Sequence, residues 1–125
     1  YKGTSALSEP ESKALANLAN STNWTMTISY HSMGNLVYWD FAGNKVAEQS
    51  KELAELVTGI SGYRTNRSSG KGGFKDYVQI KDSPIPSLTI EVGSVACPMP
   101  ASEFGNVWNS NQSILAALAA YAADH

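Results

Sequence analysis

Two stretches of the chain alternate apolar and polar residues, which is the pattern of a β-strand with one buried face. In Thr25–His31 every second residue from Met26 onward is apolar, and the stretch ends in a histidine. In Pro84–Gly93 the apolar residues of the second half face one side, and Glu91 faces the other. Both predicted strands therefore have an ionisable side chain near their carboxyl end.

These two side chains have an ordinary interpretation and a chemical one. In the ordinary interpretation Glu91 lies in water on a half-exposed strand and His31 is a hydrogen-bonded strand histidine. In open α/β sheets, however, ligands gather beyond the carboxyl ends of the strands. A His and a Glu at that edge could hold a metal ion and move a proton. Their spacing in the sequence does not show that they meet.

The first predicted helix begins at Ser8. We expect Ser8 to cap the helix, Pro10 to fit its first turn and Glu11 to bond back to the cap. Apolar residues then recur at helical spacing, including Leu15 and Leu18, until Asn20. A capping motif is sufficient to explain these residues, so we assign them no chemistry.

Three further helices are predicted at residues 45–58, 73–81 and from Ser102 onward, and another strand is predicted at 35–39. Residues 63–73 are polar and rich in glycine, which predicts a surface loop. The order helix–strand–strand–helix–loop–helix–strand–helix predicts a single domain of the α/β class. The last helix has an apolar face formed by Phe104, Val107, Trp108, Leu115 and Leu118.

Composition excludes several classes of protein. The chain has 125 residues, of which 42% are hydrophobic and 16% are charged, as in an ordinary globular domain. The net charge is −2 without a basic cluster, so nucleic acid is not an expected partner. No apolar run approaches the roughly 20 residues that span a bilayer, so no membrane segment is expected. The single cysteine excludes an intrachain disulfide.

Four short motifs then point to a family. They are Ser-Glu-Pro-Glu at 8–11, Tyr-His-Ser at 30–32, Gly-Gly-Phe-Lys-Asp-Tyr at 72–77 and Ile-Pro-Ser-Leu-Thr-Ile-Glu-Val-Gly at 85–93. In this order they resemble zinc carboxypeptidases of the carboxypeptidase A type, in particular bacterial relatives that cut γ-D-glutamyl–diamino acid bonds in cell-wall peptides. The resemblance covers nearly the whole chain. It implies the C-terminal part of such a catalytic domain, with a partial mixed β-sheet flanked by helices.

The resemblance also implies a zinc cofactor. In the family, zinc is held by the His and Glu of a His-x-x-Glu motif and by a later His, to which His31 corresponds. Ser32 resembles a residue that lines the substrate cleft. Met33 stands where animal members have an aromatic side chain, so the neighbouring subsite is expected to differ in shape.

Two further residues take their expected roles from the same resemblance. Glu91 corresponds to the general base and acid, which accepts a proton from the attacking water and donates it to the leaving amine. Lys75 corresponds to the base of the pocket for the substrate side chain. A lysine there would pair with an acidic group, such as the side-chain carboxylate of diaminopimelate or an acidic C-terminal residue. The alternative is an exposed helix lysine.

The sequence departs from the family in what it lacks. No His-x-x-Glu occurs in the 125 residues, and the other histidine is His125 at the C-terminus. An ungapped comparison places Ser68 at the position of the family's mobile tyrosine, so that tyrosine is absent or supplied elsewhere, and we assign it to no residue. One His and one Glu cannot build a three-ligand zinc site. The chain by itself is therefore expected to be inactive and to bind zinc weakly.

Two other hypotheses remain open at this point. The chain could be a peptide-binding module, or a degenerate relative, without catalysis. A different α/β hydrolase is disfavoured because no Gly-x-Ser-x-Gly motif is present. For the peptidase we expect a peptide substrate, self-association through an exposed sheet edge, and a secreted or cell-envelope location of the full-length protein.

Overall fold

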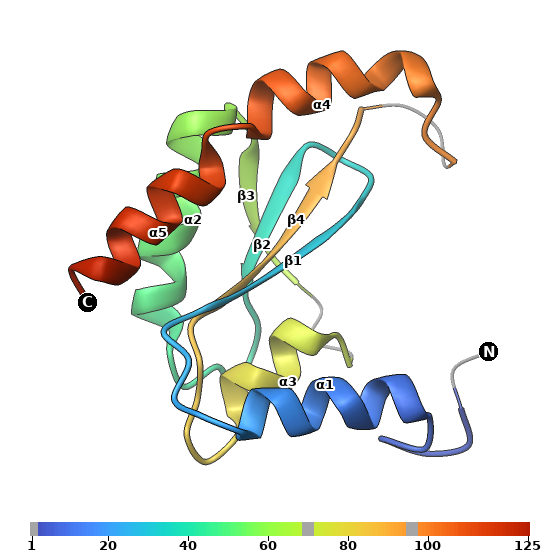
Figure 1. Ribbon diagram of the computed structural model, residues 1–125, viewed down its shortest axis with the longest axis vertical. Helices are drawn as coiled ribbons and strands as arrows, with labels where there is room; N and C mark the ends of the chain where they lie inside the picture. Colours follow the sequence, from blue (N-terminus) through green and yellow to red (C-terminus); the bar gives the residue numbers. More distant parts are fainter. Residues whose placement is uncertain (1–2, 69–71, 95–97) are drawn as a thin grey trace.

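The computed structural model describes residues 3–68, 72–94 and 98–125, and shows an α/β fold with a four-stranded mixed sheet flanked by helices (Figure 1). The strands lie in the order β1-β4-β2-β3. They are β1 (Thr27–Ser32), β2 (Leu36–Asp40), β3 (Arg64–Arg67) and β4 (Ser87–Val92). The helices are α1 (Pro10–Asn20), α2 (Ala47–Ser61), α3 (Phe74–Ile80), the short 3₁₀ helix η1 (Ala101–Glu103), α4 (Phe104–Asn111) and α5 (Ile114–Ala123).

The pairing of the strands determines which residues share a face. β1 pairs with β4 in parallel, and β4 pairs with β2 in antiparallel orientation. His31 is opposite Glu91, and Glu91 is in turn opposite Leu36. Because side chains alternate along a strand, one face of the sheet carries mostly polar residues and the other mostly apolar ones.

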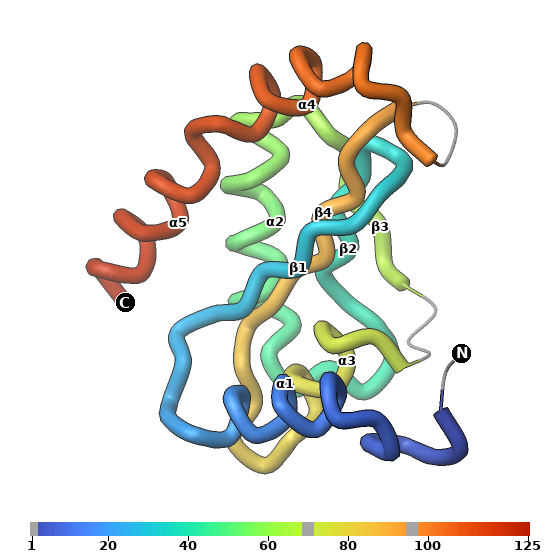
Figure 2. Tube along the Cα trace, turned by 45° about the vertical axis from the view of Figure 1, so that its right-hand side comes forward, coloured from blue at the N-terminus to red at the C-terminus, as the bar shows by residue number. Residues whose placement is uncertain are grey.

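The apolar face of the sheet forms the main core. Helices α2 and α5 cover it together on one side of the sheet, as Figure 2 shows. Its buried members from the two central strands and the two helices are Val37, Leu88, Ile90, Leu53, Ala54, Val57, Ile114 and Leu118. A second, smaller cluster joins α1 to α3 at the end of the sheet where β1 and β4 begin (Figure 1). No helix in the described ranges has the length and apolarity needed to cross a bilayer.

The prediction of a loop over residues 63–73 is wrong for its first part. Residues Arg64–Arg67 form strand β3, which pairs in parallel with β2 at the edge of the sheet. All four side chains are exposed, so the strand has no alternation that a sequence pattern could reveal. Arg67 Nη2 lies 2.7 Å from Oδ2 of the buried Asp40 on β2, which ties the strand to the sheet. Residues 69–71 lie outside the described residues.

The expected capping motif of the first helix is also wrong. Glu9 occupies the N-cap position without a side-chain cap bond, while the Ser8 hydroxyl donates to Glu9 Oε2. The apolar stripe is not the buried one, because Leu15 and Leu18 are exposed and the small residues Ala16 and Ala19 are buried instead. Ala19 packs with Val78 of α3 and with Ile85 in the smaller cluster.

The last predicted helix is divided in two. A 3₁₀ turn leads into α4, which ends at Asn111, and α5 begins at Ile114 in a new direction (Figure 1). Three residues of the expected apolar face, Phe104, Trp108 and Leu115, are more than half exposed. Leu118 of the expected face is buried as predicted, and Ile114, which was not in it, joins Leu118 in the core. The predicted helices at 45–58 and 73–81 are present as α2 and α3.

Candidate active site

The structure brings His31 and Glu91 together. They are register partners on the adjacent parallel strands β1 and β4, near the carboxyl end of both. Paired residues on neighbouring strands point to the same face of a sheet, with Cβ atoms roughly 5 Å apart. The two side chains therefore stand next to each other on the polar face, at the end of the sheet that bears the strand termini.

The two side chains differ in exposure. His31 is exposed, whereas Glu91 is half-buried. Glu91 Oε2 is inaccessible to solvent and has no hydrogen-bond partner within the described residues. An unpaired buried carboxylate oxygen is costly, so native proteins usually give such an atom a partner. Glu91 therefore has an oxygen available for water, a ligand or another group.

The segments that follow the two strands meet at the same end of the sheet. The amide of Gly34, after β1, donates to the carbonyl of Gly93, after β4, at 2.8 Å. Gly93 has a φ of +87°, and a Cβ at this position would lie 2.5 Å from Met99 Sδ and 4.0 Å from Met33 Cβ. The glycine thus lets both methionines approach the end of β4. Ser32 and Met33, joined by a cis peptide bond, are both exposed beside the candidate site.

Tyr30 precedes His31 and points to the opposite face. Burial, and to a smaller extent the nearby Tyr63 hydroxyl, raises the pKa of Tyr30 above its usual value. This residue therefore stays neutral at physiological pH and is not a candidate base.

Lys75 is not an exposed helix lysine, so that alternative is wrong. Its side chain is 3% exposed and lies at the start of α3. Its Nζ atom is 2.6 Å from Asp76 Oδ1, donates to Gln79 Oε1 at 3.4 Å and lies 4.9 Å from the centroid of the Phe41 ring. The charge of Lys75 is therefore already neutralised by its neighbour.

Gln79 connects this ion pair to the rest of the fold. Its side-chain amide is fully buried and donates to the carbonyls of Trp39 and Ser87 and to the hydroxyl of Ser50. Ser50 Oγ also accepts from the amide of Ser87, and Ser87 Oγ donates to the carbonyl of Lys75. One buried network thus joins α2, α3, β2 and the beginning of β4.

Lys75 of α3 and Glu91 of β4 lie near opposite ends of strand β4. Ser87, which contacts Lys75, shares a face of β4 with Thr89 and Glu91 because residues two apart point the same way. At about 3.3 Å per residue, the strand separates Ser87 from Glu91 by roughly 13 Å. The polar face of β4 therefore leads from the candidate catalytic pair towards the buried lysine.

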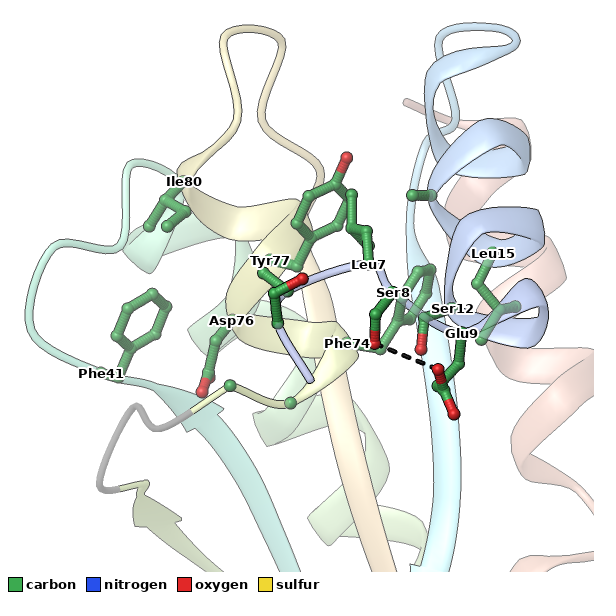
Figure 3. Close-up of a pocket in the computed structure, with 15 residues that line it drawn as sticks. Leu7, Ser8, Glu9, Ser12, Leu15, Phe41, Phe74, Asp76, Tyr77 and Ile80 are labelled. Atoms are coloured by element: carbon green, nitrogen blue, oxygen red, sulfur yellow. Dashed lines mark hydrogen bonds between the residues drawn. The ribbon is translucent and has the colours of Figure 1, made fainter. Parts of the chain in front are cut away.

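A cavity of about 490 Å³ lies between α1 and α3, at the end of the sheet far from Glu91. Figure 3 shows Phe74, Tyr77 and Leu15 around it, together with Asp76 and the hydrogen-bonded pair Ser8 and Glu9. Neither His31 nor Glu91 contributes to its lining. The sequence did not indicate this cavity, because α1 and α3 are separated by more than fifty residues.

The described residues supply only part of a metal centre. They contain no group of three or more His, Cys, Asp or Glu side chains placed to share an ion. The exposed imidazole of His31 fits one position in a zinc coordination sphere, and the unpaired oxygen of Glu91 fits a neighbouring base. A closed zinc site needs two further donors from protein outside these ranges.

Asp76 and Gln79 are the site residues that sequence reasoning missed. Asp76 directly follows Lys75, so a buried charge pair was a signal available in the sequence. Gln79 gave no signal, because its three acceptors come from residues 8 to 40 positions away.

Comparison with known proteins supplies the family. The family model described as zinc carboxypeptidase matches residues 1–113. Gamma-D-glutamyl-L-diamino acid endopeptidase 1 of Lysinibacillus sphaericus is 33% identical over 94% of this chain and 29% of its own length. The uncharacterized protein YqgT of Bacillus subtilis (strain 168) is 29% identical over 92% of this chain and 31% of its own length. The chain thus spans less than a third of these relatives. It belongs to the zinc carboxypeptidase family.

Proposed function

We propose that this chain supplies one half of the catalytic centre of a zinc-dependent peptidase that hydrolyses amide bonds. The observation that carries the proposal is the pairing of His31 with Glu91, whose Oε2 atom is buried without a partner in the described part of the chain. In the proposed enzyme His31 is a zinc ligand. The other ligands would come from protein outside the described residues.

The proposed reaction depends on proton transfer by Glu91. Bound zinc would supply Lewis acidity, which polarises the scissile carbonyl and makes a nearby water more acidic. The Glu91 carboxylate accepts a proton from the attacking water and then delivers it to the nitrogen of the leaving amine. Partial burial suits this role, because it keeps the carboxylate oxygens close to the reacting atoms and away from bulk water.

We propose an acidic peptide as the substrate, with diaminopimelate-containing cell-wall peptides as the specific class. The carboxylate-bearing side chain of such a substrate would lie on the polar face of β4, which leads from Glu91 towards Ser87. Lys75 lies beyond Ser87, and it would release Asp76 and pair with the substrate carboxylate in its place. Ser32 and Met33 would line the cleft beside His31. The name of the Lysinibacillus relative is in accord with this class.

Replacing Glu91 tests the proposed chemistry. In the whole protein we expect Glu91→Gln to lower kcat by a factor of about 10² to 10⁴, because the amide cannot accept the proton. Zinc content, measured by atomic absorption, should stay unchanged, since Glu91 is not a proposed ligand. His31→Ala should instead lower both activity and zinc content. Near-normal turnover of the Glu91→Gln variant would refute the role of this residue.

The second candidate function is peptide binding without hydrolysis. The lack of a three-donor group in the described ranges favours it. It predicts that the whole protein binds an acidic peptide with the same affinity in zinc and in a chelator, and that no cleavage product appears. Chelator-sensitive release of a new amino group from the same peptide would exclude this candidate.

We also propose that the whole protein is secreted or held in the cell envelope, because the proposed substrate class occurs there. Cell fractionation with an antibody to the chain tests this location.

A further inference from the structure

Four hydroxyl groups lie on the polar face of the sheet between Glu91 and the Ser87 end, and none of them has a hydrogen-bond partner within the described residues. They come from three neighbouring strands and belong to Thr27, Ser29, Tyr38 and Thr89. Thr27 and Ser29 share the face of His31 by alternation, and Tyr38 is opposite Thr89 in the sheet register. A hydroxyl both donates and accepts, so this face can accompany a polar side chain of either charge.

The ion pair at the Ser87 end carries one charge of each sign. Lys75 Nζ lies 2.6 Å from Asp76 Oδ1, and the two side chains are 3% and 10% exposed. In the described ranges no other cation lies within ion-pair distance of Asp76. A substrate that brings only a carboxylate to Lys75 therefore leaves Asp76 buried without a cation, and an unpaired buried charge is costly. Binding at Lys75 is thus favoured when the ligand also brings a cation for Asp76.

Asp76 has a second carboxylate oxygen that is free to bind a ligand. Its Oδ1 atom accepts from Lys75, whereas Oδ2 has no hydrogen-bond partner within the described residues. Asp76 also lines the cavity of about 490 Å³ between α1 and α3, where Figure 3 shows it among the lining side chains. In the described part of the chain this lining contains no lysine, arginine or histidine, and its other charged member is Glu9. The cavity therefore gives the carboxylate room to turn and lets a cation approach it.

We infer that Asp76 is a specificity-determining residue, which binds an ammonium group next to the substrate carboxylate that Lys75 binds. The inference rests on the proposed function and narrows its substrate class to side chains that end in an amino acid group, as diaminopimelate does. Such a group exchanges the Lys75–Asp76 pair for two new ion pairs, so each buried charge keeps a partner. A simple diacid or a lysine in the substrate would satisfy only one of the two charges.

The first test compares four peptide substrates of the unchanged whole protein, which differ only in the side chain of the residue that is released. Diaminopimelate carries both charges at the end of its side chain, 2-aminopimelate carries the carboxylate alone, lysine the ammonium alone and norleucine neither. We expect kcat/KM for the diaminopimelate peptide to exceed that for each of the other three about ten-fold or more, because a buried charge of the site stays unpaired with the single-charge side chains.

The second test replaces Asp76 by a residue that needs no cation. In Asp76→Asn we expect kcat/KM for the diaminopimelate peptide to fall about five-fold or more, and its advantage over the 2-aminopimelate peptide to shrink to less than about two-fold. The matched control is Asp82→Asn, which removes an exposed carboxylate shortly after α3 and should keep the full preference. Circular dichroism shows whether Asp76→Asn folds, and if it does not, the substrate comparison in the unchanged protein decides alone.

Two results would overturn the inference and leave the peptidase proposal in place. They are equal kcat/KM for the diaminopimelate and 2-aminopimelate peptides, and an unchanged preference in a folded Asp76→Asn variant. Hydrolysis of none of the four peptides would instead remove the proposed function. Binding of the same peptides, measured by NMR titration, would then decide the inference. Tighter binding of the diaminopimelate peptide than of the 2-aminopimelate peptide would support it, and equal binding or no binding would overturn it.

Discussion

The buried charged groups at the two ends of strand β4 are in opposite states. At the Ser87 end, the side chains of Lys75, Asp76 and Gln79 are buried, and none of them has a buried atom without a partner in the described ranges. At the other end, Glu91 retains a buried oxygen without a partner. A satisfied network stabilises one conformation, whereas an unsatisfied ionisable group next to an exposed histidine suits chemistry. The comparison separates the residues that hold the strand from those that we expect to react.

Breaking the buried ion pair should have the largest effect. Lys75→Met leaves the Asp76 carboxylate buried without its cation, and such a loss costs about 3–5 kcal/mol. The free energy of unfolding, measured by urea denaturation of the chain, should fall by that amount. The control is Lys51→Met, which removes an exposed partner 4.0 Å from Glu55 and should cost less than about 0.5 kcal/mol. Equal losses in the two variants would show that the buried pair does not stabilise the fold.

Removing the side-chain amide of Gln79 should have the next largest effect. Gln79→Leu is similar in size but removes the hydrogen bonds to two carbonyls and a serine hydroxyl, which we expect to cost about 2–4 kcal/mol. Glu91→Gln is the matched change at the other end of the strand. It removes a charge whose buried oxygen has no bond to lose, so the chain should keep its stability or become more stable. Urea denaturation of both variants decides whether the two ends differ as described.

The sequence predicted much of the Glu91 end of the molecule because its signals are local. Two strands with clear alternation each end in an ionisable residue, and the motifs around His31 and Glu91 occur within a few positions of them. Sequence could not show that the two residues are register partners, since β1 and β4 are separated by two strands and two helices. The catalytic roles of His31 and Glu91, and those of Ser32, Met33 and Lys75, stay predictions.

The Ser87 end was harder to predict because its contacts are long-range. Gln79 bonds to Trp39 and Ser50, which lie 40 and 29 positions away, and a glutamine on a short helix gives no sign of this. The same reason explains the missed strand β3, whose side chains are all exposed and which is held by pairing with β2. Hydrophobic periodicity reports burial of one face, so it misses elements that are positioned by polar contacts.

The outer edge of β1, on the Glu91 side of the comparison, is expected to cause a weaker effect, which is association of the chain with itself. The amide of Thr27 donates towards β4, so by alternation the amides and carbonyls of Ile28, Tyr30 and Ser32 point away from it. In the described ranges this side carries no further strand, and we expect copies of the chain to pair along it. Light scattering at rising concentration should show association. Tyr30→Pro, which removes an outward donor, should reduce it.

The matched control for this edge is Tyr30→Phe, which keeps the backbone donor and should associate like the unchanged chain. A chain that stays monomeric at millimolar concentration would contradict the expected pairing. Equal association of the proline and phenylalanine variants would place the contact elsewhere on the surface.

The smallest expected effect comes from a polar contact that is satisfied but exposed. The Tyr121 hydroxyl donates to Glu52 Oε2 at 2.8 Å and joins α5 to α2. Burial, and next the bond to Glu52, raises the pKa of Tyr121 above 10. The folded state thus favours the neutral phenol, and this stabilisation is complete below pH 10 and is lost as pH rises through the raised pKa.

We expect Tyr121→Phe to lower stability by about 1 kcal/mol or less at pH 7. The difference from the unchanged chain should shrink above pH 10. Urea denaturation at pH 7, 9 and 11 measures it, and a difference that stayed constant over this range would show that the hydroxyl acts through packing. The Tyr121–Glu52 contact is exposed, whereas the network around Ser87 is buried. If Tyr121→Phe lost as much stability as Gln79→Leu, burial would not determine the strength of a polar contact in this fold.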